Sequence, residues 1–209
     1  MGRAPCERCG CREERPLRRA RRQHGGGGGA TRGGGYPERL ASRLRKEGAS
    51  LGLDNLGQSG ARIRDVFTQQ VKRAVAAQPT LVTLGVGTND IWRGTPLEEF
   101  QDDLDRIARR LKQTGAPLVL VNIADMALAP VAKLVPSTLY EGRIEPFNAA
   151  MQDVARAHGL HLVDLYSASK EMIPRSPHFF SHDGFHPSDE GYEEWADLLL
   201  PTVRTLVGR

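Results

Sequence analysis

Three short apolar runs, separated by stretches with helical periodicity, constrain the fold of this chain more than any other feature. The runs are Thr80 to Val86, Leu118 to Ile123 and Leu160 to Leu165, and their length and composition are typical of strands in a buried sheet. Pro96 to Thr114 and Ile144 to His158 lie between them and repeat apolar residues at helical spacing. Strands that alternate with helices predict an α/β fold, in which helices cover both faces of a parallel sheet.

The same alternation extends beyond these runs in both directions. Further helices are predicted at Pro37 to Glu47, Ala61 to Ala77 and Asp189 to Val207, the last with Ser188 as its N-cap. Leu51 to Leu56 is a further strand candidate, and it ends in a glycine-rich turn. Ala124 to Arg143 has little regular pattern, so we expect a loop there.

The first 32 residues differ in composition from the rest. Residues 1–24 contain eight Arg and three Glu, whereas residues 25–209 contain 21 basic and 22 acidic side chains, so the net charge of +4 belongs to the N-terminal segment. Gly25 to Gly29 is an unbroken glycine run, and the residues before it show neither helical nor strand periodicity. We therefore predict two parts: residues 1–32, which are disordered or mistranslated, and a single domain over residues 33–209.

The N-terminal segment allows two other interpretations. Its arginines could bind nucleic acid or acidic lipid through charge, but the remaining chain is nearly neutral, so no nucleic-acid partner is expected. Cys6, Cys9 and Cys11 could suggest zinc, but a fourth ligand at suitable spacing is absent and His24 is the only nearby candidate, so we expect no metal.

Nothing in the sequence indicates a membrane span or export. No apolar run reaches the roughly 18 residues that a span needs, and no apolar signal-peptide core follows the first arginines. As written, the chain is expected in the cytoplasm, but the sequence leaves the localisation open, because an altered N-terminus could hide an export signal.

Asp183 and His186 are three positions apart and are followed by Pro187. A histidine that acts as a general base needs a carboxylate to fix its tautomer and to stabilise the imidazolium that forms. A short Asp-x-x-His loop can supply both groups. The same residues can also occur in a surface loop that has no catalytic role.

Two further motifs follow directly after predicted strands. In parallel sheets, binding and catalytic sites lie at these carboxyl ends of the strands. Gly87 to Asp90 follows the first apolar run, and the Asn89 side chain could donate an N–H to a developing oxyanion. Gly57 to Gly60 follows the Leu51 to Leu56 candidate, and the Gly60 N–H would lie near the start of the next helix. Each motif alone is also compatible with an ordinary turn.

Together and in this order, the three motifs resemble the SGNH (GDSL-type) hydrolase family, from about Gly33 to the C-terminus. The resemblance implies a flavodoxin-like three-layer α/β/α sandwich whose parallel sheet has the strand order 2-1-3-4-5. It implies that His186 is the general base, that Asp183 orients it, and that Gly60 and Asn89 form an oxyanion hole. It also implies cleavage of a small-molecule ester without a metal or another cofactor.

The first block of the family is missing from this sequence. It should be a buried strand that ends in Gly-Asp-Ser, with the serine as nucleophile, and no Gly-Asp-Ser occurs in the 209 residues. One permitted DNA spelling of Arg18 to Gly29, read one base later, encodes Val-Ala-Leu-Gly-Asp-Ser-Thr-Gly-Val-Gly-Val, which places the missing serine at Gln23. We therefore hypothesise an N-terminal frameshift that replaced or disrupted the first strand. The Arg-rich replacement is predicted to lie outside the sheet or to fit it poorly, because burying its charges is costly.

The sequence thus predicts a serine ester hydrolase that works through an acyl-enzyme. Its substrates would be carboxylic esters, thioesters or lysophospholipid-type esters. Because the nucleophile is absent, inactivity of this chain is one expected outcome. The alternative is a non-catalytic binding domain that keeps the SGNH fold and uses its cleft.

Overall fold

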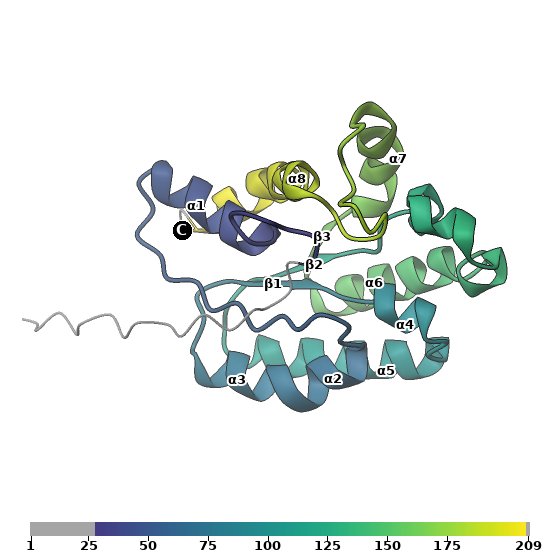
Figure 1. Ribbon diagram of the computed structural model, residues 1–209. Helices are drawn as coiled ribbons and strands as arrows, with labels where there is room; N and C mark the ends of the chain where they lie inside the picture. Colours follow the sequence, from purple (N-terminus) through teal and green to yellow (C-terminus); the bar gives the residue numbers. More distant parts are fainter. Residues whose placement is uncertain (1–27, 208–209) are drawn as a thin grey trace, which may run out of the picture.

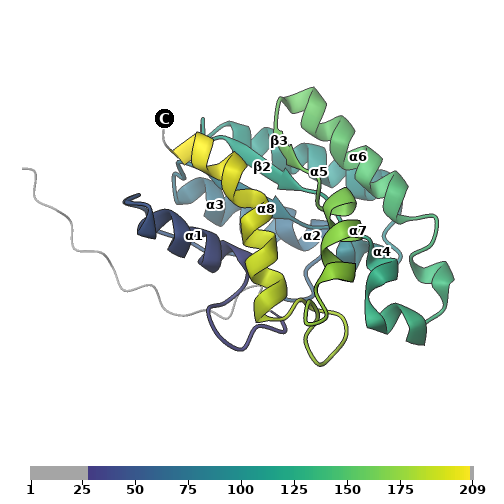
Figure 2. The same cartoon turned by 90° about the horizontal axis from the view of Figure 1, so that it is seen from above.

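The computed structural model describes residues 28–207, which form three layers (Figures 1 and 2). A parallel sheet lies in the middle. On one face it is covered by α1 (Tyr36–Lys46) and α8 (Asp189–Val207), and on the other by α5 (Leu97–Lys112) and α6 (Ile144–His158). The predicted α/β class, with a parallel sheet between helices, is confirmed.

The sheet in this part of the chain has three parallel strands, in the order β1 (Val82–Gly85), β2 (Leu118–Val121) and β3 (His161–Val163). The two ladders begin with the pairs Val82–Leu118 and Val119–His161. This order agrees with the last three positions of the predicted 2-1-3-4-5 arrangement. The segment expected to hold the first strand lies outside the described residues, so the full order stays a prediction.

Side chains of the sheet alternate between two apolar clusters, because successive residues of a strand point to opposite faces. Leu118 and Leu120 of β2 join the cluster that packs on α5 and α6, whereas Val119 and Val121 join the cluster that packs on α1 and α8. All four side chains are at most 3% exposed. β2 is therefore buried on both faces, as its continuous apolar run predicts.

The remaining helices are short or irregular. They are α2 (Ile63–Asp65), α3 (Val71–Ala76), α4 (Thr88–Trp92) and α7 (Leu165–Arg175), with a π-helical turn at Val66–Gln70 between α2 and α3. Three 3-10 turns, at Met126–Leu128, Pro130–Leu134 and Ser137–Leu139, occupy the segment where the sequence predicted a loop. In the part of the chain that the structure describes, no helix is long and apolar enough to cross a membrane.

The strand predicted at Leu51 to Leu56 is wrong, because these residues pair with no strand of the described sheet. Leu51 packs instead against the cluster of α1 and α8. In the predicted order this segment would pair with the first strand, which the described residues do not include. Apolar spacing alone does not make a strand, since its N–H and C=O groups need a neighbouring strand.

The sequence also failed to predict α4 and α7. The carboxylate of Asp164 accepts the Ser167 N–H at 3.1 Å and caps α7, so the helix begins at Leu165. The apolar run from Leu160 to Leu165 therefore contains only the three strand residues of β3.

Several predictions for the N-terminus fall outside residues 28–207. They are the three cysteines, the Arg-rich replacement of the first strand, and the nucleophile position near Gln23. The boundary predicted between residues 1–32 and 33–209 likewise stays a prediction.

Candidate active site

Asp183 and His186 lie in the loop between α7 and α8, which holds them in contact. His186 Nδ1 is 2.8 Å from one carboxylate oxygen of Asp183. The other oxygen accepts the Ser181 hydroxyl at 2.8 Å, and the N–H groups of Phe185 and His186 at 2.8 and 2.9 Å. These contacts fix the carboxylate and, through it, the imidazole ring.

The protonation of this pair follows from its contacts. Burial by itself raises the pKa of Asp183, but the hydrogen bonds from His186, Phe185 and Ser181 outweigh burial and hold this pKa well below its ordinary value. An ionised carboxylate only accepts hydrogen bonds, so the proton of a neutral His186 ring is on Nδ1. Nε2 then keeps its lone pair and is the atom that can act as a base.

Gly28 packs against the same imidazole ring. A Cβ atom at this position would lie 2.6 Å from Cδ2 and 2.7 Å from Nε2 of His186. The Gly28 carbonyl accepts a hydrogen bond from the Tyr192 hydroxyl on α8, at 2.9 Å. The described chain therefore begins beside Nε2 of His186.

Gly60 and Asn89 come together where the turn before α2 meets α4. Asn89 Nδ2 donates to the carbonyl of Ala61, the residue after Gly60, at 3.1 Å. The second amide hydrogen of Asn89 remains, and the Gly60 N–H has no acceptor within residues 28–207. Two N–H donors without acceptors thus lie at one junction.

Asp90 and Gly87 hold this junction from the interior. Asp90 is fully buried and accepts the Ile63 N–H of α2 at 3.0 Å. Burial raises the pKa of Asp90, although the Ile63 N–H opposes this shift. Gly87 has a φ of 114°, and a Cβ there would lie 2.5 Å from Ile123, so the tight turn into α4 requires glycine.

An open apolar pocket of about 310 Å³ lies beside Asn89. Its lining residues are Asn89, Trp92, Val131, Val135 and Phe185. The rings of Trp92 and Phe185 meet edge to face at 5.8 Å, and the Phe185 ring is 4.8 Å from that of His186. The pocket thus links Asn89 to the His186 loop, and its apolar lining suits an acyl chain or a similar group.

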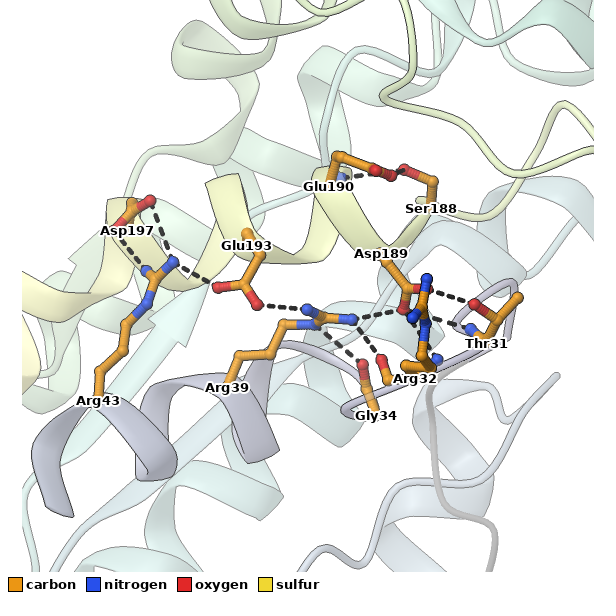
Figure 3. Close-up of polar contacts among 11 residues, drawn as sticks. Thr31, Arg32, Gly34, Arg39, Arg43, Ser188, Asp189, Glu190, Glu193 and Asp197 are labelled. Carbon is orange, nitrogen blue, oxygen red and sulfur yellow. Dashed lines mark hydrogen bonds and ion pairs between the residues drawn. The ribbon is translucent and has the colours of Figure 1, made fainter. Parts of the chain in front are cut away.

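Arginines of α1 and carboxylates of α8 form a charge ladder, defined as Arg39, Arg43, Asp189, Glu193 and Asp197 (Figure 3). Arg39 is only 8% exposed and pairs with Asp189 at 2.5 Å and with Glu193. Arg43 pairs with Glu193 at 2.5 Å and with Asp197. Within each helix the members are four positions apart, so they lie on one face and fix how α1 and α8 align.

The charge ladder also holds the chain that follows Gly28. Asp189 accepts the N–H groups of Thr31 and Arg32 at 3.2 and 3.1 Å. Arg39 donates to the carbonyl of Arg32 at 2.6 Å and to that of Gly34 at 3.1 Å. Because Asp189 closely follows His186 in sequence, this network ties residues 31–34 to the His186 loop.

The predicted site residues therefore form two contacting groups, Asp183 with His186 and Asn89 with the Gly60 turn, and the pocket links them. Sequence reasoning missed the charge ladder, because Arg39 and Asp189 are 150 positions apart and no local pattern connects them. Within the described range, no group of three His, Cys, Asp or Glu side chains is arranged to hold a metal ion.

Comparison with known proteins identifies the family. The model of the GDSL-like lipase/acylhydrolase family matches residues 23–194, which is more than four-fifths of the 209-residue chain. The chain belongs to this family. The resemblance to GDSL-type hydrolases is thereby confirmed, and the chain is a hydrolase of the esterase and lipase kind by family. No curated protein matches it by sequence.

Solved structures of this kind share the fold. TesA is 24% identical over 82% of this chain and 88% of its own, with a TM-score of 0.68. The lipase/acylhydrolase from Enterococcus faecalis is 22% identical over 81% of this chain and 85% of its own, with a TM-score of 0.66. The acetyl xylan esterase AlAXEase is 20% identical over 83% and 92%, with a TM-score of 0.69. These likenesses establish a common GDSL-like fold.

Proposed function

We propose that this GDSL-like protein is built to hydrolyse small carboxylic esters or thioesters through an acyl-enzyme, with His186 as general base. One observation carries the proposal. The carboxylate of Asp183 leaves Nε2 of His186 free to accept a proton, and an apolar pocket links this loop to the N–H groups of Gly60 and Asn89.

In this mechanism a serine oxygen attacks the acyl carbon while Nε2 of His186 removes the serine proton. Asp183 stabilises the imidazolium, and the N–H groups of Gly60 and Asn89 donate to the oxyanion. Collapse of the intermediate expels the alcohol or thiol, which takes the proton from His186. Water then attacks the acyl-enzyme by the same steps, releasing the acid and restoring the serine.

The serine has to come from a position that this sequence fills with other residues. The resemblance places it at Gln23, five positions before Gly28, which packs on His186. Five extended residues span at most about 17 Å, so a serine there is within reach of the base. Without it, activity should fall on the order of 10³-fold or more below that of an intact triad.

Hydrolysis of p-nitrophenyl acetate tests the assignment. We would compare this chain with a variant that carries Arg21→Gly, Arg22→Asp and Gln23→Ser, and with the same variant plus His186→Ala. Only the first variant is expected to show a burst of p-nitrophenol followed by steady turnover. Equal activity in all three proteins would show that neither the serine position nor the base is assigned correctly.

The absence of Gly-Asp-Ser favours a second candidate, a non-catalytic binding domain of the same fold. Such a domain would hold an ester ligand in the apolar pocket without cleaving it. A serine variant that binds the ester, keeps its fold and yet does not hydrolyse it would support this candidate over the esterase.

A further inference from the structure

Asn89 and Arg93 present two side chains to the same turn. Arg93 directly follows α4, and its N–H donates to the Asn89 carbonyl at 3.0 Å. Residues four apart lie on one face of a helix. The Asn89 side chain reaches the Ala61 carbonyl, and the Arg93 guanidinium lies against Gly60, where a Cβ would be 3.3 Å from its Nη2.

The guanidinium of Arg93 has no protein partner in the described part of the chain. Its side chain is exposed and takes part in no ion pair or hydrogen bond there. Arg39 and Arg204, by contrast, bind carboxylates. A guanidinium stays charged at any ordinary pH and offers a planar fork of N–H donors. Arg93 is therefore a free cation beside the turn that carries the Gly60 N–H.

The neighbour of Arg93 in sequence faces a different environment. Trp92 contacts the rings of Tyr140 and Phe185 and lines the apolar pocket. The end of α4 thus presents an apolar wall through Trp92, and the next residue, Arg93, presents a cation. Asn89 lines the pocket beside Trp92 and also contacts the turn beside Arg93. An ester held at Asn89 could place an apolar acyl group in the pocket and a charged group near Gly60.

We propose that Arg93 forms an anion subsite, so that the preferred ligands are acyl esters whose alcohol part carries a phosphate or a carboxylate. The inference rests on the proposed function, because it takes the ester carbonyl to lie at Gly60 and Asn89. Phosphate and carboxylate are both compact anions that can accept two parallel N–H hydrogen bonds from one guanidinium. A phosphate is the better fit, since it carries more charge than a carboxylate.

Binding to this chain, without substitution of the N-terminal residues, tests the proposal. The probes are three ether lipids without an ester bond: 1-O-decylglycerol 3-phosphate, 3-O-decylglycerate and neutral 1-O-decylglycerol. They are titrated by calorimetry below their aggregation concentrations and at low salt. We expect the phosphate to bind about 5- to 20-fold more tightly than the neutral probe, the carboxylate to fall between them, and the preference to shrink as salt is added.

Variants of Arg93 separate its role from general charge. Arg93→Gln should bind all three probes with the affinity of the neutral one, and Arg93→Lys should keep part of the preference, since it retains the charge but loses the fork. Arg110→Gln, which removes an exposed arginine from α5, should leave the preference intact.

The possible failures are distinguishable. Equal binding of the three probes to the unsubstituted chain, or an unchanged preference in Arg93→Gln, would overturn the anion subsite and leave the proposed hydrolase standing. Failure of all three probes to bind would contradict both the subsite and the apolar acyl pocket on which the proposed function depends.

Discussion

Gly28 shows how closely the N-terminal segment approaches the candidate base. Its backbone φ is not in the left-handed region, so a substitution there tests contact and not backbone strain. We predict that Gly28→Ala displaces either the segment or the His186 ring, since the new Cβ would lie 2.6 to 2.7 Å from ring atoms. The loss of stability should be about 1–3 kcal/mol, as for other overpacked sites.

Thermal unfolding and the NMR signals of the His186 ring measure this effect. Gly52→Ala is the matched control, because a Cβ at Gly52 meets nothing within 4 Å and its φ is also not positive. If both substitutions left stability and the imidazole signals unchanged, the contact between Gly28 and His186 would not exist in solution.

The contribution of Asp183 to stability should depend on pH. Its pKa is lower in the folded chain than in the unfolded one, so its contribution to stability is present above the ordinary aspartate pKa and is lost as pH falls through the folded value. Asp183→Asn should therefore destabilise the protein at pH 7, by about 1–2 kcal/mol for the charge-assisted hydrogen bonds, and have less effect at acidic pH.

Urea unfolding at a series of pH values checks this expectation, and ¹⁵N spectra of the imidazole should show His186 losing its preference for the Nδ1–H tautomer. Asp153→Asn, at an exposed helical pair with Arg156, is the control. An Asp183→Asn effect that is constant with pH would mean that the carboxylate is not held ionised by its contacts.

At the scale of elements, the charge ladder is the feature that connects the two ends of the domain. Arg39→Met leaves Asp189 and Glu193 without their buried partner and releases the carbonyls of Arg32 and Gly34. We predict a loss of about 1–3 kcal/mol, because the buried guanidinium loses hydrogen bonds to charged groups while Asp189 and Glu193 keep contact with solvent. The amides of Thr31 and Arg32 should also exchange faster with solvent, because Asp189 no longer holds a fixed position.

Arg204→Met is the matched control for the ladder. Arg204 of α8 pairs with Glu47, the residue that follows α1, but the two side chains are 54% and 40% exposed, so the change should have little effect on stability. Urea unfolding measures the stability of both variants. If they lost equal free energy of unfolding, the charge ladder would not be the main link between α1 and α8.

Elements were predictable where a long local pattern specified them. α6 and α8 have the predicted bounds, and β2 follows its apolar run, because periodic burial over many residues leaves few alternatives. α4 was missed because it has only five residues, three of which belong to the Gly87 to Asp90 motif, and so short a segment shows no helical periodicity. The Leu51 to Leu56 strand failed because strand formation depends on a neighbour that local sequence does not specify.

In the candidate site, too, only contacts between residues close in sequence could be predicted. Asp183 and His186 could be paired from their spacing, since one loop carries both. The contact of Asn89 with Ala61 and that of Gly28 with His186 join residues far apart in sequence, so only the folded chain reveals them.

At the scale of the whole molecule, the contact of Gly28 with His186 bears on the frameshift hypothesis. In the DNA spelling used above, the alternative frame encodes valine at position 28, where even a Cβ would collide with His186, whereas a GGG codon for Gly28 keeps glycine in both frames. Sequencing of the G-rich tract on the transcript should show a gained or lost base, and an unaltered tract would contradict the frameshift.

The stability of the sheet as a whole should depend on its missing first strand. Among the described residues β1 pairs only with β2, and the 2-1-3-4-5 order places the missing first strand along its other edge. A variant with Val-Ala-Leu-Gly-Asp-Ser at positions 18–23 would supply an apolar strand there as well as the nucleophile. Burial of its apolar side chains should raise the free energy of unfolding by about 3 kcal/mol or more, and the added buried surface should raise the urea m-value. The control has Gly-Asp-Ser at 21–23 but keeps Arg18, Arg19 and Ala20, so it gains the serine without the strand. Identical unfolding curves for the two proteins would show that residues 18–20 do not form the first strand, and the predicted strand order would then be wrong.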